Sequence, residues 1–70
     1  MLERKDIKIG DLLVAISDGS LRKHPIKNNL YLVVNLFGYG HNGIFLIEIA
    51  TGYRFHSETR WFKKTDNFCP

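Results

Sequence analysis

The sequence predicts a single all-β domain, and three observations support this fold class. Five short segments rich in β-branched and aromatic residues follow one another along the chain. Turn-forming residues separate these segments, and strand signals outnumber helix signals throughout. Five short strands with mostly tight connections favour a small barrel, because closure protects the edge strands of a sheet.

The first predicted strand covers residues 12–16, an apolar run that ends before the turn pair starting at Asp18. Residues 19–29 are long, polar and basic, and Pro25 makes them a poor strand. We therefore expect a long first loop there. The second predicted strand, residues 30–37, is rich in β-branched and aromatic residues.

Two glycine-containing pairs predict tight turns in the second half of the chain. Asn42-Gly43 is a hairpin signal, because both residues tolerate the positive φ of a type I′ turn. Thr51-Gly52 predicts a second tight hairpin. The three strands that these turns help to delimit are residues 44–50, 53–57 and 60–64.

Length, charge and cysteine content narrow the class of protein. The 70 residues form one domain, with residues 1–6 as an N-terminal extension and 66–70 as a C-terminal tail. The formal net charge of +3 permits a polyanionic partner without requiring one. The single cysteine, Cys69, argues against a disulfide scaffold and fits a cytoplasmic location. No apolar run approaches the roughly 20 residues that span a bilayer, so we expect no membrane partner.

Alternation of side chains predicts which residues form the core. A barrel interior has no place for an unpaired carboxylate, so Glu48 should point outward. Asn35 gives the second strand its predicted orientation by the same argument. The predicted core residues are then Leu30, Leu32, Val34, Leu36, Phe45, Ile47, Ile49, Tyr53, Phe55 and Phe62. The predicted outward residues include Tyr31, Val33, Phe37, Ile44, Leu46, Arg54, His56, Trp61 and Lys63.

The order of these segments resembles the SH3-like barrels. The residues that carry the resemblance are the Gly10-Asp11 pair before the first strand, residues 31–34 and 44–47, Thr51-Gly52, and the aromatic-basic strand 60–64. The resemblance covers about residues 7–65 and is closer to the small modules of tailed bacteriophages and to KOW-type modules than to signalling domains. The acidic and aromatic pattern that binds proline-rich ligands is missing. The resemblance implies a five-stranded SH3-like barrel and a binding habit, and it implies no reaction.

Protein binding is the favoured function. Apolar residues predicted on the outward faces often mark an interface, unless the N-terminal segment folds over them. The candidate binding residues are Tyr31, Val33, Phe37, Tyr39 and Trp61. Through them a small phage-type accessory protein, located in the host cytoplasm, would cap or inhibit a larger protein. Homodimer formation through the same face is a further alternative.

A KOW-like nucleic-acid-binding module is the alternative function. Lysine and arginine would neutralise phosphates, while exposed Trp61 and Tyr39 would stack on bases. The candidate nucleic-acid-binding residues are Arg22, Lys23, Lys27, Arg54, His56, Arg60, Lys63 and Lys64.

Catalysis is not expected from this sequence. Cys69 lies in a terminal tail, where a nucleophile is hard to hold against a base. The histidines and Cys69 lack the close spacing of zinc ligands, so no metal is expected. The run from Gly38 to Gly43 matches the dinucleotide fingerprint by letters, but it precedes a strand and not a helix. We therefore expect no enzyme activity and no cofactor.

Overall fold

The computed structural model describes residues 2–19, 24–36 and 42–65. Within these ranges the chain forms five strands and two short 3-10 helices, and it forms no α-helix. The elements in chain order are η1 (Arg4–Asp6), β1 (Leu12–Ala15), β2 (Leu30–Asn35), β3 (Gly43–Glu48), β4 (Arg54–Glu58), η2 (Thr59–Trp61) and β5 (Phe62–Lys64). The all-β prediction is therefore confirmed. None of the described helices is long and apolar enough to cross a membrane.

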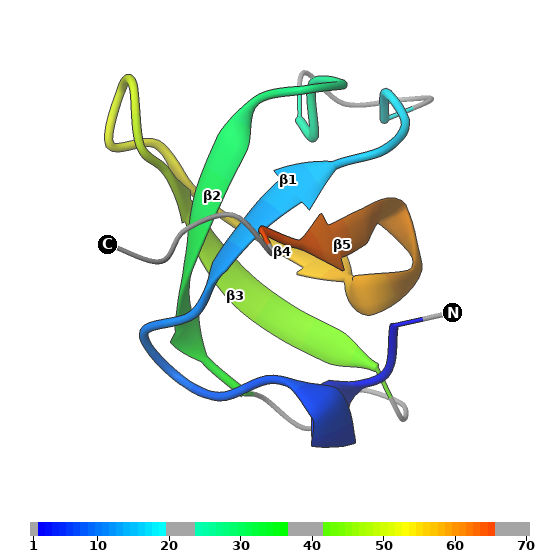
Figure 1. Ribbon diagram of the computed structural model, residues 1–70. Coiled ribbons are helices and arrows are strands. Elements are labelled where there is room, and N and C mark those ends of the chain that lie inside the picture. The colour runs from blue at the N-terminus through cyan, green and yellow to red at the C-terminus, as the bar shows by residue number, and fades with distance from the viewer. Residues whose placement is uncertain (1, 20–23, 37–41, 66–70) are drawn as a thin grey trace.

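All five strands belong to one antiparallel sheet with the order β4-β3-β2-β1-β5 (Figure 1). The first four strands pair with their neighbours in sequence, whereas β5 returns to pair with β1. The chain passes from β4 to β5 through η2, and no ladder joins these two strands in the described part of the chain. The sheet is curved but not closed by hydrogen bonds.

The connections agree with the sequence in two places and differ in one. Near the end of the long first loop, Asn28 has a positive φ of 74°, which lets the chain turn toward β2. Gly52, with a φ of 75°, makes the turn between β3 and β4, although five residues and not two separate these strands. The type I′ turn predicted at Asn42-Gly43 is wrong, because Gly43 has no positive φ and is the first residue of β3.

The inward and outward faces of β2 and β3 are the reverse of those predicted. Tyr31, Val33, Ile44 and Leu46 are 0% exposed and form the centre of the core. Ile49, which belongs to the alternate set of residues that was predicted to be buried, is 50% exposed. The prediction failed because the buried carboxylate of Glu48 is not unpaired, as described below. The other residues of the predicted interior that prove to be exposed or only half-buried on the outer face are Leu30, Leu32, Val34, Phe45 and Ile47.

The remaining core predictions are confirmed in part. Phe62 is buried, and Phe55 and Leu36 pack against the core. Leu36 returns to the inner side after the register of β2 shifts between Val33 and Asn35, because a bulge changes the alternation of side chains. Tyr53 was predicted inside but is 53% exposed. The last correction concerns Trp61, which was predicted outside and is half-buried against the core.

The N-terminal segment packs against the core, which contains the apolar residues of β2 and β3 that the sequence placed on the outward faces. The alternative in which this segment folds over those residues is therefore confirmed for Leu2 and Ile7. Ile7 is buried, and Leu2 packs against the same cluster. The backbone N–H of Arg4 donates to Asn42 Oδ1 at 3.1 Å, and the hydroxyl of Thr59 donates to the carbonyl of Leu2 at 2.8 Å. The bond to Asn42 holds η1 below the start of β3 in Figure 1.

The reversed faces can be tested with two substitutions of the same kind. Ile44→Val should lower the free energy of unfolding by about 1 kcal/mol, because it removes a fully buried methylene group. Ile49→Val, at a half-exposed position, should change it by about 0.3 kcal/mol or less. Urea denaturation of both variants measures the difference. A larger loss for Ile49→Val would mean that the assignment of the faces is wrong.

Candidate functional site

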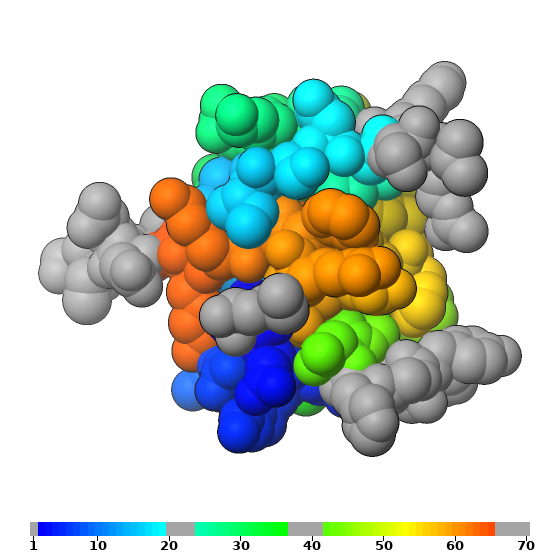
Figure 2. Space-filling model, turned by 90° about the vertical axis from the view of Figure 1, so that its right-hand side faces the viewer, coloured from blue at the N-terminus to red at the C-terminus, as the bar shows by residue number. Residues whose placement is uncertain are grey.

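An open groove lies where three segments meet on one face of the molecule. Figure 2 shows the N-terminal segment, the end of β1 and the η2–β5 region side by side on this face. The groove has a volume of about 570 Å³. We call it the basic groove, and its lining residues are Leu2, Asp6, Ile16, Arg60, Phe62, Lys63 and Lys64.

The basic groove combines apolar surface with an excess of positive charge. Its apolar part comes from Leu2, Phe62 and Ile16, and the Ile16 side chain is 46% exposed. Three cations line the groove against one carboxylate, Asp6, among its described residues. Such a surface favours a partner that carries both apolar groups and negative charge.

The three cations differ in their surroundings. The Arg60 guanidinium pairs with Glu58 at 2.9 Å and lies 4.9 Å from the centre of the Trp61 ring. Lys64 lies 3.8 Å from Asp11. Both contacts are at the surface, where ion pairs contribute little to stability. Lys63 is exposed and forms no ion pair with any residue in the described part of the chain.

Some of the site residues predicted from the sequence lie together in the basic groove, whereas others lie elsewhere. Arg60, Lys63 and Lys64 line it, and Trp61 lies beside it. Arg54 lies elsewhere, in a hollow with Val34 and Phe45. The other predicted residues away from the groove are His56, which packs against Phe45, exposed Lys27, and buried Tyr31 and Val33. Arg22, Lys23, Phe37 and Tyr39 lie outside the described residues.

Tyr31 and Val33 were proposed as surface binding residues, and their placement corrects that part of the prediction. Both side chains are 0% exposed. They point to the concave side of the sheet because the inward and outward faces of β2 are the reverse of those predicted. Neither side chain can contact a partner at the surface without unfolding.

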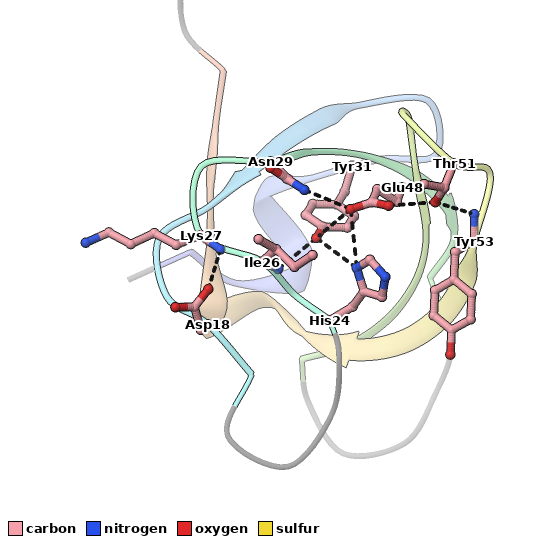
Figure 3. A network of polar contacts seen from close by, with 9 residues as sticks. All are labelled: Asp18, His24, Ile26, Lys27, Asn29, Tyr31, Glu48, Thr51 and Tyr53. Carbon is pink, nitrogen blue, oxygen red and sulfur yellow. Dashed lines mark hydrogen bonds and ion pairs between the residues drawn. The ribbon is translucent and has the colours of Figure 1, made fainter.

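A second cluster of polar residues surrounds the carboxylate of Glu48 (Figure 3). One oxygen, Oε1, accepts a hydrogen bond from the Thr51 hydroxyl at 2.6 Å. The other, Oε2, accepts from the Asn29 side-chain amide at 2.9 Å and from the Tyr31 hydroxyl at 3.5 Å. His24 Nδ1 lies 3.4 Å from the same oxygen. We call these five residues the Glu48 cluster.

Tyr31 is the central link of this cluster. Its hydroxyl oxygen accepts a hydrogen bond from the backbone N–H of Ile26 at 2.8 Å and lies 3.1 Å from His24 Nδ1. The imidazole of His24 also stacks on Tyr53, with ring centres 4.7 Å apart. The end of the long first loop is therefore attached to the sheet through polar and aromatic contacts together.

The arrangement suits a structural role for the Glu48 cluster. Both oxygens of the carboxylate are hydrogen-bonded, and Glu48 is only 3% exposed. A buried carboxylate is tolerated when donors satisfy it. Because the donors come from the loop, from β2 and from the β3–β4 turn, the cluster joins three parts of the chain.

Hydrogen bonding and burial shift the pKa values of two members of the cluster. Donation from Thr51 and Asn29 lowers the pKa of Glu48 below its ordinary value of 4.5, although burial acts in the opposite direction. Burial raises the pKa of the Tyr31 hydroxyl above its ordinary value of 10.0. Glu48 is therefore ionised and Tyr31 is neutral at neutral pH.

Neither the Glu48 cluster nor the apolar side of the groove was predicted from the sequence. A signal for the cluster exists in the sequence, because Thr51 follows Glu48 by three residues across a turn. The contributions of Leu2, Asp6 and Ile16 to the groove had no such signal, because these residues are far from β5 in the chain.

Comparisons with protein-family models, with curated proteins and with solved structures found no match. The choice of site therefore depends on the geometry. Of the two sites, the Glu48 cluster has its carboxylate buried and already hydrogen-bonded within the chain, whereas the basic groove is open. The basic groove is the candidate functional site.

The Glu48 cluster predicts a specific dependence of stability on pH. Glu48→Gln should lower the free energy of unfolding at pH 7 by about 2 kcal/mol, because the amide presents hydrogens to groups that are themselves donors. The pKa of Glu48 is lower in the folded protein than in the unfolded chain. The ionised carboxylate therefore stabilises the folded protein at pH values above the unfolded pKa, and this stabilisation is lost as the pH falls through the folded pKa. The difference from the parent protein should therefore shrink below about pH 4.5.

Thermal denaturation as a function of pH measures this effect. Glu58→Gln is the matched control, since the Glu58 side chain is about half exposed and pairs only at the surface. If the melting temperatures of the parent protein and Glu48→Gln differ by the same amount at every pH, an ionised Glu48 does not stabilise the folded protein.

Proposed function

We propose that the protein is a non-catalytic binding module of the SH3-like barrel class, which binds a larger protein through the basic groove. Support for the class comes from the return of β5 to β1, the long first loop and the short β3–β4 turn. The long loop and the turn at Thr51-Gly52 are among the features on which the resemblance of the sequence is based.

One observation carries the proposed function, namely that the groove presents apolar surface and cations together. Protein interfaces are centred on apolar and aromatic groups, with arginine often among the residues that contribute most to binding. Leu2 and the half-exposed Ile16 supply the apolar groups that a partner can reach, and Arg60 lies beside them. The partner that fits is a protein with acidic residues next to apolar ones.

Charge reversal tests the site of binding. Lys63→Glu should weaken capture of a partner from nuclease-treated cell lysate by about tenfold or more, because it places a negative charge in the groove. Arg54→Glu makes a similar change in charge at an exposed position outside the groove and should leave capture unchanged. Quantitative mass spectrometry of the captured proteins measures both. If both variants capture the partner equally well, the partner does not bind through the basic groove.

Nucleic-acid binding is a second candidate, because the same three cations are suited to phosphates and Trp61 lies next to Arg60. If all three cations contact phosphates of a single strand, log K should fall with log salt concentration with a slope of about −2. Fluorescence titration of a labelled oligonucleotide between about 50 and 200 mM salt measures the slope. No binding at the lower salt concentration would exclude this candidate.

A further inference from the structure

We propose that the basic groove binds an extended, acidic segment of a protein as an added strand on the free edge of β5. The inference deepens the proposed function, on which it rests, by specifying how the partner binds. It follows from the direction of the backbone groups of β5, from the position of the groove and from the charges beside it.

The hydrogen bonds between β5 and β1 show which backbone groups face outward. The carbonyl of Trp61 accepts from Ile16 N–H at 2.9 Å, and the N–H of Thr65 donates to the carbonyl of Leu12 at 3.4 Å. Backbone groups alternate in direction along a strand, so those of Phe62 and Lys64 point away from β1. This direction agrees with the register, in which Lys63 lies opposite Val14.

Three backbone groups of β5 are available on this edge. The N–H of Phe62 donates to the carbonyl of Thr59 at the end of η2. The carbonyl of Phe62 and both the N–H and the carbonyl of Lys64 have no backbone partner among the described residues. An added strand could satisfy all three, as in other cases of β-strand addition.

The basic groove runs along this edge and not over one face of the sheet. Phe62, Lys63 and Lys64 are consecutive, so their side chains alternate between the two faces, yet all three line the groove. The groove is therefore not confined to one face of β5, which fits a hollow that extends around the edge of this strand. Leu2 and Asp6 of the N-terminal segment line the same groove.

The charges determine what kind of strand fits. The exposed side chains of Lys63 and Lys64 lie on opposite faces of β5, and Arg60 precedes the strand. A second copy of β5 would place lysine beside lysine, and lysine on an edge strand discourages such pairing. An acidic segment meets complementary charge instead. The occupant is therefore a partner with acidic residues in an extended segment.

Substitution of Lys64 separates the backbone interaction from the charge. Proline lacks the N–H, and it is tolerated on an edge where that group faces away from the sheet. Lys64→Pro should therefore retain the fold while losing one hydrogen bond to the added strand. Lys64→Ala removes the same charge but keeps the N–H, which makes it the matched control.

The probe is a fluorescein-labelled octapeptide of alternating threonine and glutamate, and its binding is followed by fluorescence anisotropy. Lys64→Pro should bind this peptide about fivefold more weakly than Lys64→Ala, which is the effect of one hydrogen bond of about 1 kcal/mol. A peptide of alternating threonine and lysine should not bind. Circular dichroism and thermal melting establish that both variants are folded.

Amide hydrogen exchange gives a second readout that requires no variant. Addition of the acidic peptide should slow exchange at the Lys64 amide, because that N–H becomes hydrogen-bonded, whereas the Lys63 amide, already paired with β1, should change little. If the peptide binds but Lys64→Pro and Lys64→Ala bind it equally and the Lys64 amide is not protected, strand addition is wrong and the basic groove remains a binding site. If the acidic peptide does not bind at all, strand addition is also wrong, while capture of a partner by the groove is tested separately by Lys63→Glu.

Discussion

The structure depends on the burial of one ionised carboxylate. Glu48 lies at the end of β3, where Asn29, Thr51 and Tyr31 donate to its oxygens. A buried charge without these donors would be strongly destabilising, and with them it can be accommodated. Because Tyr31 and Glu48 are opposite each other in the β2–β3 register, this arrangement places both on the concave side of the sheet.

The same burial positions the long first loop. Ile26 donates to the Tyr31 hydroxyl, and His24 packs between that hydroxyl and the ring of Tyr53. The two ends of this loop are in close backbone contact. Gly19 N–H donates to the Pro25 carbonyl at 2.8 Å, and a Cβ at Gly19 would lie 2.6 Å from the His24 carbonyl oxygen. The loop is therefore closed at its base by close backbone contact as well as by the Glu48 cluster.

The basic groove depends on a different long-range contact, the return of β5 to β1. Phe62 fills the core from β5, and its ring meets the ring of Tyr31 edge to face at 5.5 Å. With Phe62 held inside, the neighbouring lysines are left at the free edge of the sheet. The N-terminal segment, held by Asn42 and Thr59, completes the opposite side of the groove.

The sequence by itself determined the strand segments, the long first loop, the turn at Gly52 and the cationic last strand. These features are local, since they depend on β-propensity, turn residues and composition. Only the tertiary structure decided which faces of β2 and β3 are buried, because both faces carry apolar residues and alternation alone cannot choose between them. The partners of Glu48 made that choice, and they come from three parts of the chain. The walls of the basic groove were likewise set by contacts between segments that are distant in sequence.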